Sequence, residues 1–265
     1  MKRKYMIIVL MAGALELTGC SQGTSNSAKN GTTGSENTII SESDIAILDT
    51  EDMFTERDRD TEYDESECTA ISLSDEETKC DSDGVKMDGQ TVTITEGGTY
   101  LLTGSLSNGS VVVDTDKTEK VQLILENVSI INEEGAGICV EQADKVFITL
   151  ADGSTNKIVS NSFTGNEDTN IDGAIFSRED LTLNGSGTLK ITSAAHGIVS
   201  KDDLVLTGGV YQIQSEKQGL SGKESVRIAD GTFTITSGTD AIHSEDTDED
   251  TKGFVYITGG VLTLA

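Results

Sequence analysis

A repeated segment of about 22 residues in the C-terminal part of the chain constrains the fold more than any other feature. Four segments align, and each has a short apolar strand pattern, a Gly-rich corner and a second strand pattern. The equivalent apolar positions are Leu181, Leu204, Val226 and Val255; Leu183, Leu206, Ile228 and Ile257; Leu189, Tyr211, Phe233 and Leu262; and Ile191, Ile213, Ile235 and Leu264. A recurring period of this kind is typical of stacked repeats.

Within each repeat, apolar and polar residues alternate, which is the period of a β-strand with one buried face. We therefore predict an all-β fold, a right-handed parallel β-helix of about 22-residue coils, over residues 85–265. This length holds about eight coils. An antiparallel sandwich is the structural alternative, because it also produces short alternating strands. Since the sequence stops inside a coil without a polar cap, we expect the domain to be truncated at its C-terminus.

The N-terminus has the pattern of a lipoprotein signal peptide. Three basic residues precede an apolar stretch, and Leu17-Thr18-Gly19 leads into Cys20. We predict that residues 1–19 are removed and that Cys20 carries the lipid that anchors the protein to the cell membrane, exposed at the cell surface. The alternative is an ordinary secretory signal followed by a chance cysteine.

Residues 20–84 are predicted to form an acidic flexible linker. A tract of Ser, Thr, Asn and Gly is followed by a strongly acidic stretch with only short apolar runs. Part of this stretch, near Cys68, is a candidate cap for the folded domain. Cys68 and Cys80 are candidates for a small disulfide loop outside the cell. Cys139 lies in an apolar strand pattern and is expected to pack in the interior.

The formal net charge of −27 narrows the choice of partners. Nucleic acid is excluded as an expected partner, because its phosphates would be repelled. Cations, neutral polymers and polymers bridged by cations remain plausible partners.

One corner of the predicted coils concentrates carboxylates, which makes it a candidate calcium site. Equivalent positions on neighbouring coils lie about 4.7–4.9 Å apart, which is close to twice the calcium–oxygen distance of about 2.3–2.6 Å. Solvated turn carboxylates without an ion are the alternative. The candidate Ca²⁺ ligands are Asp168, Asp172, Asp202, Asp203, Asp240, Glu245, Asp246 and Asp248.

Residues 85–265 also resemble a known family, most specifically in the part from residue 172 onward. The segments beginning at Asp172, Gly197, Gly219 and Lys252 are similar to secreted bacterial proteins of the carbohydrate-binding domain-containing family, related to a clostridial cellulose- and pectin-binding protein. The resemblance implies a pectate-lyase-like parallel β-helix, bound calcium and binding of plant cell-wall polysaccharide. His196 and Gln218 stand where the family usually has Asp, which puts calcium at the two middle coils in doubt.

Three functions fit these observations. We favour a non-catalytic polysaccharide-binding protein, calcium-dependent and specific for pectin, polygalacturonate or cellulose. The chain has no Trp, and the aromatic residues expected to face outward and contact sugar are Phe176, Phe254 and Tyr256. A calcium-dependent polysaccharide lyase is the second function, with Arg178 as the candidate base and Lys201 or Lys223 as substitutes. A surface adhesin or scaffold is the third, because a fold alone does not give a function.

Overall fold

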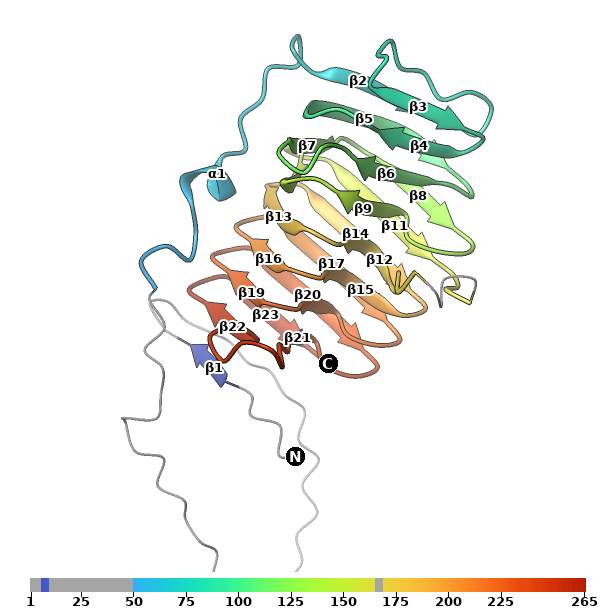
Figure 1. Cartoon of the computed structure of the whole chain (residues 1–265). Helices are drawn as coiled ribbons and strands as arrows, with labels where there is room; N and C mark the ends of the chain where they lie inside the picture. Colours follow the sequence, from blue (N-terminus) through green and yellow to red (C-terminus); the bar gives the residue numbers. More distant parts are fainter. Residues whose placement is uncertain (1–5, 10–49, 165–168) are drawn as a thin grey trace, which may run out of the picture.

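The protein is a parallel β-helix, which confirms the predicted fold class (Figure 1). The computed structural model describes residues 6–9, 50–164 and 169–265. Each coil contributes one strand to each of three faces, and strands on neighbouring coils pair in parallel, apart from an antiparallel pair at the N-terminal end. Among the described residues, no helix has the length and apolar character needed to cross a bilayer.

We name the three faces by what covers them. The arm face comprises β5 (Gly98–Leu106), β7 (Lys120–Leu125), β10 (Lys145–Leu150), β13 (Asp180–Gly185), β16 (Asp203–Leu206), β19 (Ser225–Ile228) and β22 (Phe254–Ile257). The groove face comprises β3 (Val85–Asp88), β4 (Thr91–Ile94), β6 (Ser110–Asp114), β9 (Ile138–Gln142), β12 (Gly173–Ser177), β15 (His196–Ser200), β18 (Leu220–Gly222) and β21 (Ile242–Ser244). The open face comprises β8 (Ser129–Asn132), β11 (Thr155–Ser160), β14 (Thr188–Ser193), β17 (Val210–Ser215), β20 (Thr232–Ser237) and β23 (Val261–Leu264).

The core runs along the axis of the coils and is built from the predicted ladders. All four ladders pair in the predicted register. Tyr211 and Phe233 stack on neighbouring coils with ring centroids 4.8 Å apart and planes 6° from parallel. The Tyr211 hydroxyl is also satisfied, because it donates to the Gly208 carbonyl at 2.8 Å. Period-two alternation therefore placed the correct side chains inside.

The stack has about seven coils rather than the eight we expected. The difference arises because the earlier coils are longer than the 22-residue period. Ile148 and Leu183 are paired neighbours although they are 35 residues apart in the chain. The extra length lies in the connection between β11 and β12, which includes the undescribed residues 165–168.

The tight corner just before β18 requires a glycine at position 219. A Cβ at this position would lie 2.3 Å from Cγ2 of Ile235 and 2.6 Å from the Ala241 carbonyl oxygen. These distances are far inside van der Waals contact, so the backbone of one coil approaches the next only because the side chain is absent.

The structure corrects the predicted boundary at residue 85. Residues 50–64, which we call the arm, pack on the outside of the arm face instead of forming a flexible linker (Figure 1). The arm holds the short helix α1 (Glu56–Arg59). It is followed by β2 (Thr69–Leu73), which pairs in parallel with β5 at the N-terminal end of the stack. At the other end, β1 (Met6–Val9) lies parallel to β22.

Asp58 anchors the arm to three successive coils. Its carboxylate lies 2.8 Å from Nζ of Lys145 and accepts a hydrogen bond of 2.7 Å from Thr182. Its backbone carbonyl accepts bonds from Thr207 at 2.5 Å and from Asn184 at 3.2 Å. Burial acts to raise the pKa of Asp58, but the hydrogen bonds from Lys145 and Thr182 outweigh it, and the pKa is lowered. The arm is thus an integral part of the fold.

The remaining sequence predictions for the N-terminal region have different outcomes. Residues 10–49, including Cys20, lie outside the described residues, as does most of the expected signal peptide. Cys68 and Cys80 are both free thiols, so the candidate disulfide loop is not formed. Cys139 is buried as expected, and burial raises its pKa strongly, which makes it an unreactive packing residue.

Candidate functional site

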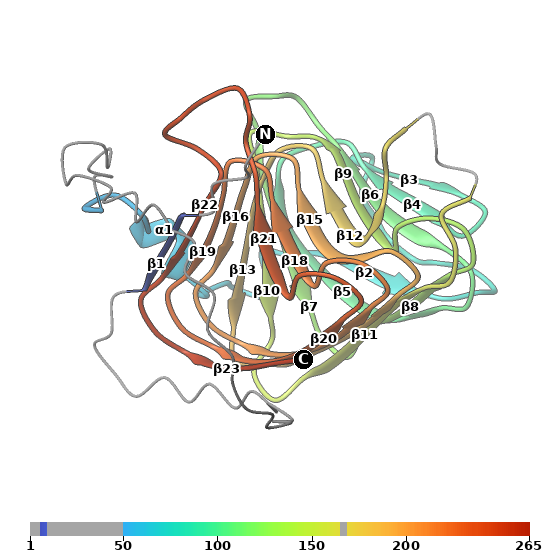
Figure 2. The ribbon, with the colours of Figure 1, turned by 90° about the horizontal axis from the view of Figure 1, so that it is seen from below.

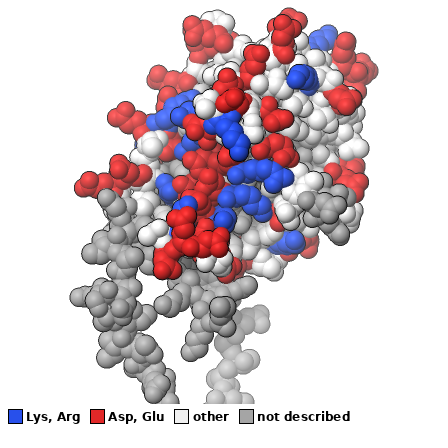
Figure 3. Space-filling view, viewed as in Figure 1, with Lys and Arg blue, Asp and Glu red and all other residues white. Residues whose placement is uncertain are grey.

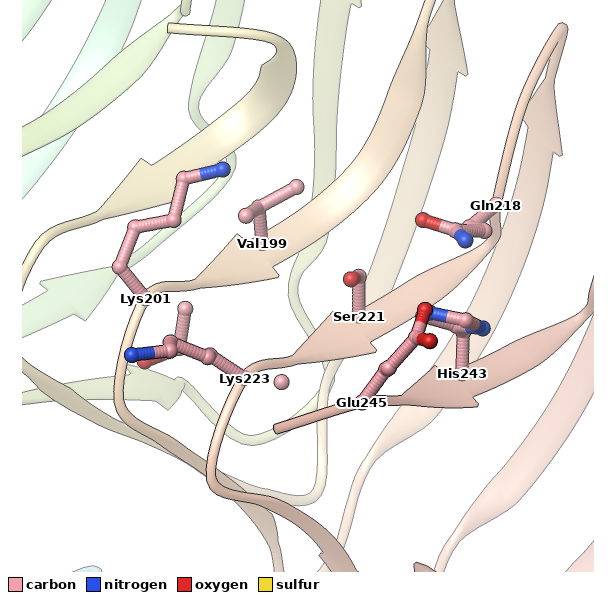
Figure 4. Close-up of a pocket in the computed structure, with 9 residues that line it drawn as sticks. Val199, Lys201, Gln218, Ser221, Lys223, His243 and Glu245 are labelled. Atoms are coloured by element: carbon pink, nitrogen blue, oxygen red, sulfur yellow. The ribbon is translucent and has the colours of Figure 1, made fainter. Parts of the chain in front are cut away.

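A groove of about 260 Å³ lies on the groove face near the C-terminal end of the stack (Figure 4). Strands β15, β18 and β21 and the corners beside them supply its walls. Figure 4 shows Lys201 and Lys223 on one side, His243 and Glu245 on the other, and Ser221 between them. The groove is therefore lined mainly by charged and polar groups, with Val199 and Gly222 among them. The lining residues are Val199, Ser200, Lys201, Gln218, Ser221, Gly222, Lys223, His243 and Glu245.

Basic residues occupy the same position on three successive coils. Ser177, Ser200 and Gly222 are paired in register at the ends of their strands, and the next residues are Arg178, Lys201 and Lys223. We call these three the basic column. Neighbouring members are about one strand spacing apart, roughly 4.7–4.9 Å along the axis. Figure 3 shows Lys and Arg side chains gathered near the middle of this side of the molecule, beside a band of Asp and Glu.

The members of the basic column differ in how firmly they are held. Arg178 Nε donates to Glu141 at 2.6 Å, and its Nη2 donates to the carbonyl of Thr169 at 2.8 Å. Lys201 makes a longer contact, 3.4 Å to Asp172. Lys223 lies 3.6 Å from Asp246 and 3.7 Å from Asp248. The two lysines are therefore the cations best able to turn toward a ligand.

The Arg178 geometry weakens its candidacy as a lyase base. A base must release its proton and reach the substrate, whereas an arginine stays protonated in proteins. Here the guanidinium is also engaged by Glu141 and Thr169 and lies 5.4 Å from the centroid of the Phe176 ring. Lys201 and Lys223, the substitutes considered from the sequence, are placed more openly and remain the candidates for that role.

Both histidines are tied to carboxylates at the corners. His196 Nδ1 accepts a hydrogen bond from the backbone of Gln218 at 3.2 Å, and its Nε2 lies 3.5 Å from Asp172. Burial lowers the pKa of His196, against the opposing effect of Asp172. On the outermost corner, His243 Nδ1 lies 3.2 Å from Asp240 and Nε2 lies 3.8 Å from Glu245. His196 is therefore a neutral hydrogen-bonding group near neutral pH.

The predicted calcium ligands are placed along this edge, but the structure pairs most of them with basic side chains. Asp168 lies outside the described residues. The pairs are Asp172 with His196 and Lys201, Asp203 with Arg227, Asp240 and Glu245 with His243, and Asp246 and Asp248 with Lys223. Within residues 6–9, 50–164 and 169–265, no three His, Cys, Asp or Glu side chains are grouped to hold a metal ion. The described members of the predicted set, apart from Asp202, are therefore held in ion pairs.

Carboxylates crowd together at the turns between the groove face and the arm face. Burial and the neighbouring Asp180 and Glu224 carboxylates raise the pKa of Asp202 to about 7. Burial also raises the pKa of Asp180. In the described part of the chain, neither residue has a basic ion-pair partner, whereas Glu224 pairs with Lys252. Asp180 and Asp202 therefore hold negative charge at this turn without a basic side chain in ion-pair contact, although the described side chains do not complete a three-ligand metal site.

The structure overturns the predicted sugar-binding role of Phe254 and Tyr256. Both side chains project away from the core, as expected, but the arm covers them. Met53 and Phe54 pack on them, and the ring centroids of Phe54 and Tyr256 are 5.9 Å apart. Each aromatic side chain is only 6% exposed. A ligand therefore cannot stack on these rings while the arm is in place.

Phe176 is also unavailable to a sugar, for a different reason. Its side chain is fully buried in a small apolar cluster with Cys139, Val199 and Ala136 on the outside of the groove face. Lys201 Nζ lies 5.3 Å from the centroid of its ring. Phe176 therefore supports the basic column and presents no surface of its own.

Sequence reasoning identified Arg178, Lys201 and Lys223 as alternative bases of a lyase but did not predict that they act together as a row of cations. The signal was visible in the aligned repeats, where Ser177-Arg178, Ser200-Lys201 and Gly222-Lys223 occupy the same position. Ser221 was also missed, because a serine on the outside of a strand has no distinguishing pattern.

Comparison with known proteins supports a carbohydrate-related role. The model of the carbohydrate-binding domain-containing protein family matches residues 88–265. A carbohydrate-binding domain-containing protein of Acetivibrio thermocellus is 42% identical over 186 residues, which cover 69% of this chain and 65% of that protein. The chain thus spans about two thirds of its relative's length. The solved gadolinium derivative of the polysaccharide lyase-like protein from C. thermocellum matches with a TM-score of 0.71 and 34% identity, covering 74% of this chain and 82% of that chain.

Proposed function

The chain belongs to the carbohydrate-binding domain-containing protein family, and on this premise we propose that it binds an acidic cell-wall polysaccharide, such as polygalacturonate, along its groove face. The observation that carries the proposal is the basic column on three successive coils of a protein with a net charge of −27. A glycan with a carboxylate on each sugar presents charges in a row. A row of cations on a rigid sheet complements that pattern.

The groove supplies further polar contacts beside the column. Ser221, Gln218 and the His243 ring line it together with Glu245 (Figure 4). Hydroxyl, amide and imidazole groups are suited to sugar hydroxyls, which both donate and accept hydrogen bonds. The absence of a stacking aromatic in the described groove lining implies that affinity depends mainly on charge and hydrogen bonding. Binding should then weaken steeply as salt is added.

We propose that calcium assists this binding beside Asp180 and Asp202, where carboxylates of the glycan would complete a ligand set that the described protein side chains do not complete alone. A bound calcium ion would neutralise these carboxylates and supply a bridge to a glycan carboxylate. Burial raises the pKa of Asp202 first, and the neighbouring Asp180 and Glu224 carboxylates raise it further, so a cation placed beside Asp202 would offset repulsion that the folded protein contains. We also retain the proposal that Cys20 is lipidated, which would hold the solenoid at the cell surface.

Calorimetric titration of the full chain with polygalacturonate tests the proposal. We expect the wild type to bind. The double variant Lys201→Ala/Lys223→Ala should bind about tenfold more weakly, because it loses roughly two partly exposed ion pairs with the glycan. The charge-matched control is Lys157→Ala/Lys190→Ala on the open face, which should bind like the wild type. If both variants lose the same affinity, the loss is caused by the change in net charge, and the groove is not the binding site.

The same samples separate binding from catalysis and from a calcium requirement. Absorbance of unsaturated products during the titration would indicate a lyase, an alternative suggested by the solved lyase-like relative. Added calcium should strengthen binding in the wild type, and a chelator should reverse it. If calcium has no effect on affinity, the calcium proposal is wrong, and the basic column alone provides the electrostatic attraction to the glycan. Failure to bind any acidic glycan would favour the scaffold alternative.

A further inference from the structure

Lys145 and Asp58 form an ion pair that is nearly closed off from solvent. Nζ of Lys145 lies 2.8 Å from Oδ1 of Asp58, and the two side chains are 15% and 3% exposed. The centroid of the buried Phe147 ring lies 5.5 Å from the same Nζ. Figures 1 and 2 both show α1, which holds Asp58, against the outside of the arm face. The amine and the carboxyl group are thus in contact under a cover that excludes most water.

The preceding coil carries a matching pair in solvent. Lys120 on β7 is the register partner of Lys145, and its Nζ lies 2.9 Å from Oδ2 of Asp144. These two side chains are 60% and 45% exposed, so water stabilises both charges. The low pKa of Asp58 keeps the charged forms as the main state of the buried pair. Because burial removes hydration from both charges, transfer of the lysine proton to the carboxylate costs less there than at the exposed pair.

The carboxyl group of Asp58 is surrounded by hydrogen-bond donors. The Thr182 hydroxyl donates to Oδ1 at 2.7 Å, and the backbone N–H and hydroxyl of Thr55 donate to Oδ2 at 2.9 Å and 2.8 Å. Donors fixed in this way stabilise the negative charge that develops on the oxygens when a nucleophile attacks the carboxyl carbon. That carbon is one bond beyond Oδ1, and reacting atoms held at about 3–3.5 Å are close to attack geometry.

Asp180 provides an acid–base group beside the pair. It is the register partner of Lys145 on β13, so the two side chains leave the same side of adjacent strands. Burial raises the pKa of Asp180, against the opposing effect of Lys145. A raised pKa brings a carboxyl group closer to the pH at which it can both take and return a proton.

We propose that Lys145 and Asp58 join in a side-chain amide bond, which cross-links the arm to β10. In the neutral pair, the amine nitrogen of Lys145 attacks the carboxyl carbon of Asp58, and a C–N bond forms. Asp180 accepts a proton from that nitrogen and donates it to a hydroxyl group on the same carbon, which leaves as water. The ion pair thus becomes one amide and one water molecule, and the reaction needs no oxidant, reductant or co-reactant.

This bond makes the arm a permanent part of the solenoid. Hydrogen bonds attach other points of the arm, such as those from Arg227 to the Met53 carbonyl and from Asn184 to the Asp60 carbonyl. Such bonds can break one after another when the chain before residue 50 is pulled. With the cross-link, the pull passes from residue 58 directly to β10 in the middle of the stack. The inference goes beyond the proposed function and does not depend on which ligand the groove binds.

Intact-mass spectrometry of the full chain, folded and then denatured, tests the inference. We expect the wild type to be lighter by one water molecule than the mass calculated for its observed N-terminus. Lys145→Arg keeps the cation without a reactive amine and should have the full calculated mass. Lys120→Ala removes the exposed pair and should lose water like the wild type. Asp180→Asn should lose water about a hundredfold more slowly or less, because a positioned acid–base group contributes roughly 10²–10⁴-fold.

Protease digestion locates the bond, because loss of water at an Asp–Gly sequence such as Asp152-Gly153 changes the mass equally. The expected product is a branched peptide that contains both Asp58 and Lys145. The inference is refuted if the folded wild type keeps its full mass after prolonged incubation, or if its digest lacks the branched peptide. Circular dichroism shows that each variant is folded. A folded Asp180→Asn variant that forms the bond at the wild-type rate would refute the role of Asp180.

Discussion

Nζ of Lys145 on β10 lies 2.8 Å from Oδ1 of Asp58 in the arm, and the Asp58 side chain is only 3% exposed. An ion pair this well shielded is costly to break from one side, because the remaining charge stays buried without its partner. The pair joins a segment near residue 58 to the middle of the stack. It shows that the arm contributes to the stability of the solenoid.

We predict that Asp58→Ala lowers the free energy of unfolding by about 3 kcal/mol, the loss typical of removing one partner of a buried pair. Denaturant unfolding followed by circular dichroism measures the change. Asp60→Ala is the control, because Asp60 pairs with Arg57 in solvent and should cost less than about 1 kcal/mol. If the two variants lose similar amounts of unfolding free energy, the contacts of Asp58 stabilise the fold no more than an exposed ion pair does.

Two substitutions at the stacked rings of Tyr211 and Phe233 in the core should destabilise the protein by different amounts. Phe233→Ala should cost about 3–5 kcal/mol, because the cavity cannot collapse between rigid coils. Tyr211→Phe removes only the hydroxyl that donates to Gly208 and should cost about 1 kcal/mol. Thermal and denaturant unfolding of the two variants give the comparison. If Phe233→Ala costs no more than Tyr211→Phe, the core at this rung is not close-packed.

The pKa of Asp202 predicts how stability depends on pH. Its value of about 7 in the folded protein exceeds the value of about 3.9 for an unperturbed carboxyl group. The folded state therefore holds an extra proton between these values, and the resulting stabilisation is full below about pH 4 and lost as the pH rises through 7. We expect the Tm of the wild type to fall between pH 5 and 8 more than that of Asp202→Asn.

This comparison needs an exposed carboxylate as its reference. Asp88→Asn, on β3 at the far end of the stack, should follow the wild-type curve. Parallel pH curves for Asp202→Asn and the wild type would show that Asp202 does not hold the proton.

The repeat predicted the part of the fold that depends on local pattern. Leu189, Tyr211 and Phe233 are in register because the same alternation recurs at a fixed period, and a strand has only two sides. Phe254 and Tyr256 show where this reasoning stops. Their outward direction follows from alternation, but their burial depends on Met53 and Phe54, about 200 residues earlier in the chain.

The arm itself could not be recognised from composition, because its acidic residues resemble a solvated linker. Two local signals were present. Thr55 and Asp58 have the spacing of a capping box, which the structure forms at α1. Met53 and Phe54 are adjacent apolar residues in an otherwise charged stretch. Neither signal identifies the partner surface, since Lys145, Thr182 and Thr207 are distant in sequence.

The same long separations determine the order in which the molecule can fold. Arg227 bonds to the carbonyl of Met53 across 174 residues, and Thr207 bonds to Asp58 across 149. The arm therefore has no docking surface until β10 to β22 have formed, although ribosomes make it before any of the coils. Coils need only their neighbours to propagate, whereas the arm must wait for the whole stack. The arm, which is synthesised before every coil, thus reaches its native position after the coils it packs on.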